Sequence, residues 1–249
     1  MEELRVFTFA PNWGLPSMGP FALKLLAWLD NAGLPYVQVI ENRADKGPLG
    51  KSPWIELGGR RIGDSDTIIR HLAQLHGLPD PTAIRSAAEA RADALKIAFE
   101  ERFHQILEWE LFVHPAGSAE MRRIISAGLP PVIGPLAFAQ FARHLRRQLQ
   151  ARGIARLPEA DIVDTGRRQL DGLALCLEAN RGRLGDGGPG LVDFAVWGQV
   201  APMLAWPMPT PVAEHAKTLE PLAAFHARTI GGEPISDARP AELEAALGP

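Results

Sequence analysis

The residues best suited to chemistry stand in two short stretches. Lys51 and Ser52 precede Pro53, where a strand is expected to begin, and Asp64 and Ser65 follow at the expected start of a helix. Free N–H groups and the helix dipole favour an anion at a helix N-terminus. Backbone next to a strand-opening proline can pair with an extended ligand. The two stretches therefore predict a small corner that binds an anion and a peptide.

Each stretch also has a purely structural interpretation. Pro53 can do no more than start a strand. Asp64 or Ser65 can be an ordinary N-cap, because Asp and Ser are common caps. The two stretches lie thirteen residues apart, and their combination favours the ligand-binding interpretation.

Short strands and helices are expected around this corner. Apolar and β-branched runs, breakers and helical periodicity predict a strand–helix–strand unit and then a hairpin and a helix. The hairpin would turn at Gly58-Gly59, a pair suited to a primed turn, and the first two strands would be parallel. In chain order, these elements are expected at residues 4–10, 20–32, 36–40, 54–57, 60–62 and 65–76.

The second half of the sequence has helical periods and no convincing strand. It predicts an all-helical domain at residues 87–249, joined through a linker at 78–86 to an α/β domain at 1–77. The expected helices span residues 87–113, 119–127, 136–152, 159–180, 191–204 and 212–229.

Composition narrows the function classes. A chain of 249 residues with 46% hydrophobic content can bury a full core, and its net charge of −3 gives no case for nucleic acid or an anionic membrane. The arginines between residues 143 and 156 are interpreted as a solvated helix face.

The single cysteine, Cys176, excludes an internal disulfide and a zinc site built on cysteines, and no metal is expected. Cys176 lies in an apolar helical run and is expected to be an inert, buried thiol. No window reaches the ~20 apolar residues of a membrane span. The early acids argue against a signal peptide. We expect a cytoplasmic protein.

This layout resembles the glutathione S-transferase superfamily, in which an α/β thioredoxin-like N-terminal domain precedes an all-α domain. The resemblance implies that Pro53 follows a cis peptide bond and that the Ser52 backbone binds the cysteinyl part of glutathione. Lys51 would meet the glycyl carboxylate. Asp64 and Ser65 would hold the γ-glutamyl end, with Asp66 sharing its ammonium group. Glutathione is thus the expected co-substrate.

Two further resemblances refine the expectation. The stretch PGLVDF at 189–194 resembles the family's capping box, with Gly190 in place of the Ser/Thr cap and Asp193 retained, and a structural role is expected. GPFALKLLAWLDNAGLPY and IGDSDTIIRHL look like the failed-axon-connections and metaxin-like branch. PNWGLPS looks like bacterial transferases that conjugate epoxides, isoprene epoxide included.

The sequence departs from the family where catalysis is expected. Many branches place Ser or Cys directly before Pro-Phe, and this chain has Gly19 there, with Ala22 at the second thioredoxin-type position. Thiol-disulfide exchange by a protein cysteine is therefore excluded at this site. The candidates for stabilising the glutathione thiolate are Ser17 first, then the Asn12 amide, the Trp13 indole and backbone N–H groups of the loop.

Two functions follow from the resemblance. The first is a detoxifying glutathione S-transferase that conjugates the glutathione thiolate to a small hydrophobic electrophile, an epoxide or a halide. The second is a non-catalytic binding or adaptor protein of metaxin-like type. A homodimer is expected in either case. Candidates for the electrophile pocket are Trp13, Leu15, Phe103, Leu107 and Trp109, and His104 is either a core or surface histidine or an acid or base for an epoxide oxygen.

Overall fold

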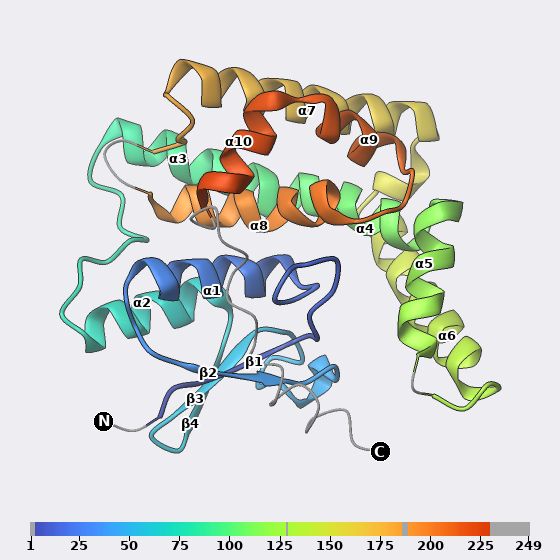
Figure 1. The fold of residues 1–249 in the computed structure, drawn as a ribbon, viewed down its shortest axis with the longest axis horizontal. Helices are drawn as coiled ribbons and strands as arrows, with labels where there is room; N and C mark the ends of the chain where they lie inside the picture. The colour runs from blue at the N-terminus through green and yellow to red at the C-terminus, as the bar shows by residue number, and fades with distance from the viewer. Residues whose placement is uncertain (1–2, 128, 186–188, 230–249) are drawn as a thin grey trace.

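A four-stranded sheet carrying two helices is followed by a helical part (Figure 1). The computed structural model describes residues 3–127, 129–185 and 189–229. Residues 230–249, which fall in the expected helical domain, lie outside the described part. The α/β elements are β1 (Arg5–Thr8), α1 (Pro20–Asn31), β2 (Val37–Ile40), the 3-10 turn η1 (Ala44–Lys46), β3 (Trp54–Leu57), β4 (Arg60–Gly63) and α2 (Ser65–Leu75).

The sheet has the strand order β2-β1-β3-β4. β1 is parallel to β2 and antiparallel to β3, and β3 is antiparallel to β4. Gly58 and Gly59 have φ angles of 57° and 70°, which a primed turn requires and which glycine adopts without steric cost. The predicted strand–helix–strand and hairpin–helix order is confirmed, and so is the predicted fold class.

The helix α1 is enclosed between the sheet and the helical part (Figure 1). Its residues from Ala22 to Leu29 are all buried, including Lys24. Close contact with α8 depends on Gly198, because a Cβ at that position would lie 2.4 Å from the carbonyl oxygen of Pro20. The tight packing fixes the start of α1, where catalysis was expected.

The helical part follows from residue 87 onward. Its elements are α3 (Ala87–Ile97), the π-helical turn η2 (Ala98–Phe103), α4 (His104–Phe112), α5 (Pro115–Ser126), α6 (Ile133–Ala151), the 3-10 turn η3 (Ile154–Arg156), α7 (Glu159–Ala179), α8 (Leu191–Ala205), α9 (Pro211–Thr218) and α10 (Glu220–Thr229). No strand occurs among the described residues of this part. None of the described helices is long and apolar enough to cross a membrane.

Several helix boundaries differ from the prediction. The helix expected at 87–113 contains the π-helical turn η2, and the one expected at 212–229 is two helices. The second break has a local cause, because Pro221 lacks an N–H group and sits in the first turn of α10. The helix expected at 119–127 begins earlier, at Pro115, which occupies its first turn.

The prediction for Cys176 is wrong, because its side chain is exposed. α7 buries the face that carries Ile162, Leu170 and Leu177, and Cys176 lies outside it. The apolar run around Cys176 covers more than the buried face, and Leu175 is likewise exposed.

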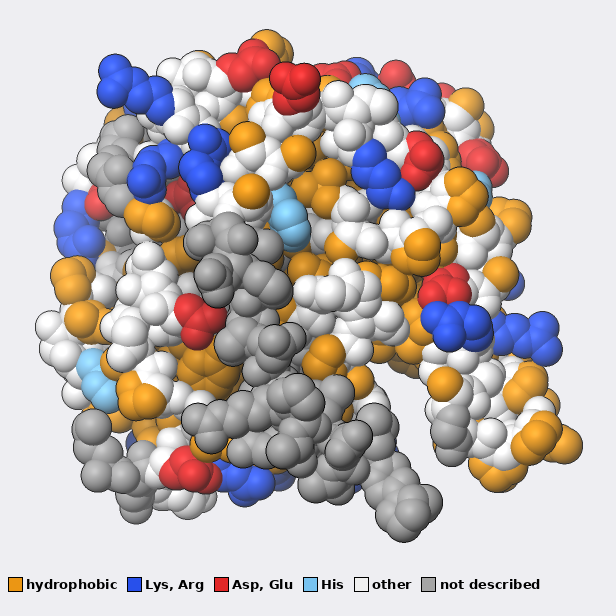
Figure 2. All heavy atoms as spheres, viewed as in Figure 1, with side chains coloured by type: hydrophobic (Ala, Val, Ile, Leu, Met, Phe, Trp, Pro, Cys, Tyr) orange, Lys and Arg blue, Asp and Glu red, His pale blue; other side chains and the backbone are white. Residues whose placement is uncertain are grey.

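An arm formed by α5 and α6 extends from the end of α4, and in the space-filling view it projects at the right of the molecule (Figures 1 and 2). The arginines between residues 143 and 152 lie on α6 or at its end, and those at 143, 146 and 147 are exposed. This exposure agrees with their interpretation as a solvated helix face.

Candidate functional site

The strand register brings the two predicted stretches together. Trp54 of β3 pairs with Gly63 of β4, so Pro53, directly before β3, and Asp64, directly after β4, lie at the same end of the hairpin. Sequence spacing alone suggested this juxtaposition, and the antiparallel pairing accounts for it.

Asp64 caps α2 from a strained backbone conformation. Its φ angle is 72°, and its carboxylate accepts a hydrogen bond from the Thr67 N–H group at 2.9 Å. Asp64 is therefore an N-cap, as the structural interpretation expected. Ser65 is buried, with 3% of its surface exposed, and stands at the first position of the helix, where N–H groups lack partners within the helix.

Ser52 precedes Pro53 and so lies at the same end of the hairpin as the start of α2. The Ser52–Pro53 peptide bond is cis, as the resemblance implied. The Ser52 hydroxyl oxygen is buried and has no hydrogen-bond partner among the described residues. A buried polar atom without a partner calls for an explanation, and a bound ligand is one.

Lys51 is exposed. Burial opposes ionisation of Glu108 on α4, but His104, Arg152 and Lys51 together hold its pKa below the usual range. Lys51 therefore lies within electrostatic reach of α4, at the boundary between the two parts of the chain.

The start of α1 carries no side-chain cap. Gly19 is the N-cap residue, and its N–H group donates to the Ser17 hydroxyl at 3.1 Å. Ser17 has none of its surface exposed. The first catalytic candidate thus lies at the predicted helix start, with its hydroxyl engaged by the backbone.

Asn12 and Trp13 shape the loop before α1. The Asn12 side-chain oxygen accepts from the Trp13 N–H group at 2.9 Å, and Asn12 and Leu15 form two backbone hydrogen bonds. The Trp13 ring packs edge-on against Trp206. Its indole nitrogen is buried and has no hydrogen-bond acceptor among the described residues. The pKa of Glu120 is lowered mainly by Arg123, and the nearby Trp13 indole N–H group adds a smaller effect in the same direction.

His104 of α4 lies in a polar environment that the sequence did not predict. His104 Nδ1 lies 3.0 Å from Gln199 Oε1, and the imidazole ring packs edge-on against Phe21, the second residue of α1. His104 Nε2 lies 3.5 Å from Glu108. The spacing of His104 and Glu108 on one helix was a visible signal, but Gln199 is distant in sequence and only the tertiary structure brings it there.

The remaining pocket candidates are mostly core residues. Leu15, Phe103, Leu107 and Trp109 are each at most 4% exposed. Trp13 is half-buried. Of the five candidates, only Trp13 combines an apolar surface with partial exposure.

Asp66 is engaged by other protein groups. Its carboxylate bonds to Lys24 of α1 and lies 2.5 Å from Lys96 of α3. Both carboxylate oxygens of Asp66 are thus engaged by lysines, and its sharing of a ligand ammonium group stays a prediction.

Asp193 has the structural role expected of it. Its carboxylate accepts hydrogen bonds from the N–H groups of Gly190 at 2.9 Å and Leu184 at 2.8 Å.

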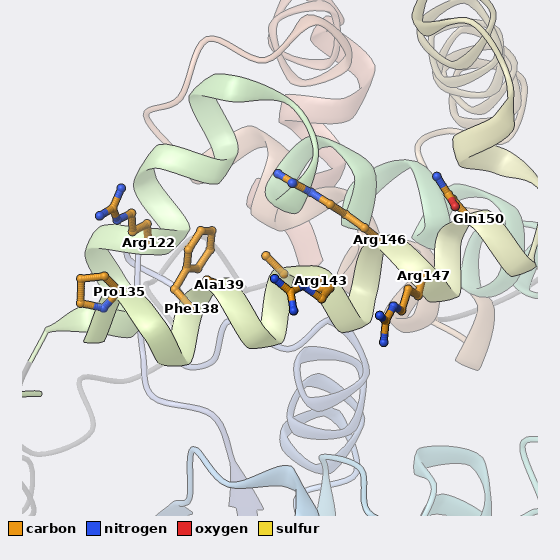
Figure 3. A pocket seen from close by; sticks show the side chains of 9 residues that line it. Arg122, Pro135, Phe138, Ala139, Arg143, Arg146, Arg147 and Gln150 are labelled. Carbon is orange, nitrogen blue, oxygen red and sulfur yellow. The ribbon is translucent and has the colours of Figure 1, made fainter. Parts of the chain in front are cut away.

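A cavity of about 520 Å³ lies along the arm formed by α5 and α6 and shares no residue with the corner described above (Figure 3). Among its lining residues are Arg122, Arg143 and Arg147. Among the described residues, no three His, Cys, Asp or Glu side chains come together as a metal site.

The chain is similar in sequence to known proteins. A family model described as the glutathione S-transferase N-terminal domain matches residues 20–117. The chain is 26% identical over 113 residues to an isoprene-epoxide–glutathione S-transferase from Rhodococcus sp. (strain AD45), a match that covers 44% of each chain. It is 41% identical over 72 residues to Failed axon connections of Drosophila melanogaster, which covers 29% of this chain and 17% of that protein. These matches span less than half the length of either relative.

Solved structures align with most of the chain. β-Etherase LigF from Sphingobium sp. strain SYK-6 aligns with a TM-score of 0.55 and 19% identity, over 97% of both chains. Glutathione transferase F7 from Populus trichocarpa aligns with a TM-score of 0.55 and 14% identity, over 98% of this chain and 97% of that one. At these identities the likeness concerns the fold alone.

Proposed function

Because the chain belongs to the glutathione S-transferase superfamily, we propose that it binds glutathione at the hairpin end and conjugates it to a small hydrophobic electrophile. The observation that carries this proposal is the pairing of Trp54 with Gly63, which brings Ser52–Pro53 beside Asp64–Ser65. The unpartnered Ser52 hydroxyl supports a ligand there.

Each part of glutathione has a matching group in this proposal. The Ser52 backbone, at the cis bond to Pro53, pairs with the cysteinyl part, and Lys51 neutralises the glycyl carboxylate. The γ-glutamyl carboxylate binds the Ser65 hydroxyl and the free N–H groups of α2, where the helix dipole favours an anion. Asp64 supports this helix end through its bond to Thr67.

The reaction we propose is a nucleophilic displacement. The thiolate sulfur forms a bond to an electrophilic carbon while a C–O bond of an epoxide, or a C–halogen bond, breaks. The alkoxide then takes up a proton, or the halide leaves. The protein contributes proximity and thiolate stabilisation. Ser17, Asn12, Trp13 and the backbone N–H groups before α1 are the proposed sources of that stabilisation. An electrophile of the epoxide class is supported by the likeness to the Rhodococcus transferase.

Calorimetry with glutathione and a conjugation assay with an epoxide test this proposal. Ser65→Ala should weaken glutathione binding roughly ten- to a hundredfold, since it removes a hydrogen bond to a charged ligand (~1.5–3 kcal/mol). Asp64→Ala should weaken it less, about fivefold, because it removes the cap of α2 (~1 kcal/mol) and leaves the ligand contacts in place. Asp164→Ala, on the exposed surface of α7, is the matched control. Absence of glutathione binding by the unmodified chain at millimolar concentration would refute the proposal.

A second candidate is a non-catalytic binding protein. Gly19 offers no side chain at the position where relatives carry the catalytic residue, and Ser17 is buried and engaged by the backbone. Glutathione binding without conjugation of any epoxide or halide would favour this candidate. In both cases we infer a cytoplasmic homodimer, and light scattering of the purified chain tests the dimer.

A further inference from the structure

Four charged side chains form an ion cluster beside the first turn of α2, called the buried ion cluster because both of its lysines are buried, although the Asp66 side chain is 31% exposed. Lys24 of α1 bonds to Asp66 of α2 and lies 2.6 Å from Glu100 of η2. Lys96 of α3 lies 2.5 Å from the second oxygen of Asp66 and 3.6 Å from Glu100. The Lys24 and Lys96 side chains are 1% and 9% exposed. The cluster therefore joins both parts of the chain through two ion pairs, Lys96 with Asp66 and Lys24 with Glu100.

Asp66 and Lys96 of the buried ion cluster are each favoured in the charged form. Burial raises the pKa of Asp66, but Lys24 and Lys96 outweigh that effect and hold it below its usual range. Burial also opposes the charge of Lys96, and Asp66 and Glu100 raise its pKa above the usual range. Removing one cation leaves a buried charge less well compensated, so the contact responds strongly to substitution.

A π-helical turn marks the same place. η2 begins two residues after Lys96 and contains Glu100, so the widened turn falls within the stretch that binds Asp66 and Lys24. Such turns are rare in helices and recur at functional sites. This is a backbone observation, independent of the charges.

The buried ion cluster also adjoins the proposed ligand corner in sequence. Asp66 directly follows Ser65, and Asp64 holds the Thr67 N–H group within the same turn. One turn of helix is thus fixed on one side by its own cap and on the other by the cations of α1 and α3. Hydrogen-bond donors held this way lose little freedom when they meet a ligand.

This inference rests on the proposed glutathione site. We propose that Lys96 and Lys24 are positioning residues that act through Asp66, holding Ser65 and the N-terminus of α2 in the geometry that the γ-glutamyl carboxylate needs. The helical part thereby sets the affinity for one end of glutathione without touching it.

The test compares two ligands on one variant. Lys96→Met should weaken glutathione binding about tenfold in calorimetry, near the lower limit for loss of a charge-assisted contact. Binding of cysteinylglycine should not change, because this dipeptide lacks the γ-glutamyl group. Lys96→Arg should restore most of the affinity, and Arg168→Met, on the surface of α7, is the control.

A role limited to fold stability predicts a different pattern. Equal losses for glutathione and cysteinylglycine, or no loss in a folded Lys96→Met protein, would overturn the inference and leave the proposed function standing. If Lys96→Met does not fold, Asp66→Asn serves as the second variant, and the same selective loss is expected. In a double-mutant cycle, Lys96→Met should have little further effect on glutathione affinity once Ser65 is alanine. An unmodified chain that binds no glutathione refutes the proposed function and this inference together.

Discussion

Gly19→Ser tests where the thiolate of glutathione is stabilised. Gly19 has φ −88° and ψ 116°, an extended conformation that serine adopts freely, and it caps α1 without a side chain. A Cβ at this position would lie 3.2 Å from Phe9 and 3.6 Å from the Ser17 hydroxyl. The substitution thus requires a shift of a few tenths of an ångström in the Phe9 ring, and an N-cap serine is worth only a few tenths of a kcal/mol over glycine. The fold should tolerate it.

The expected effect on the thiol follows from the added hydroxyl. A hydrogen bond to a charged group contributes roughly 1.5–3 kcal/mol, and about 1.4 kcal/mol corresponds to one pKa unit. The pKa of bound glutathione should therefore fall by about one to two units from a starting value near 8.5 for a free thiol. At pH 7 the thiolate fraction would rise roughly eightfold to twenty-five-fold. A thiolate of lower pKa is also a weaker nucleophile, with a Brønsted slope of about 0.4–0.5. The net gain in conjugation rate should be about threefold.

The assay is ultraviolet absorbance of the bound thiolate as a function of pH, together with the conjugation rate of a chloronitrobenzene. Gly19→Ala is the matched control, because it adds the same Cβ without the hydroxyl. If Gly19→Ser and Gly19→Ala give the same thiol pKa, the sulfur does not sit at the start of α1 and the placement of the catalytic site there is wrong.

Three further predictions concern the packing that supports the site. Gly198→Ala should destabilise the fold by about 1–3 kcal/mol, because its Cβ would lie 2.4 Å from the Pro20 carbonyl oxygen. Gly172→Ala, with nothing within 4 Å, should be neutral or stabilising, and thermal unfolding of both variants checks this. Glu110→Ala should lower the free energy of unfolding by about 3 kcal/mol or more, because the hydroxyl of Thr210 and the N–H groups of Val212 and Ala213 would lose their buried acceptor. Glu178→Ala, on the surface, is the control and should have little effect, and urea unfolding measures both. Because the folded pKa of Asp66 is depressed, its stabilisation is present above the ordinary aspartate pKa of 3.8 and is lost as the pH falls through the folded pKa. The stability difference between the unmodified chain and Asp66→Asn should therefore be constant at pH 5–8 and shrink below about pH 4, and a difference that grows on acidification would contradict this sign.

Local sequence signals predicted much of the corner. Pro53 before an apolar run, the Gly58-Gly59 pair and the Asp64-Ser65 cap are nearest-neighbour features, so their conformations follow from residues within a few positions. Helix ends were predicted less well, although the prolines at 115 and 221 are local signals for two of them, and the π-helical turn at 98–103 leaves no clear periodicity signal.

The sequence by itself determined the strand and helix order, the fold class and the residues at the hairpin end. The reason is that turn residues and apolar periodicity act locally. Only the tertiary structure decided that Asp66 is bound by Lys24 and Lys96. It also decided that Gln199 meets His104, that Ser17 is buried, and that Cys176 is exposed. These outcomes depend on which helix faces meet across tens of residues, and such contacts leave no mark in the spacing along the chain.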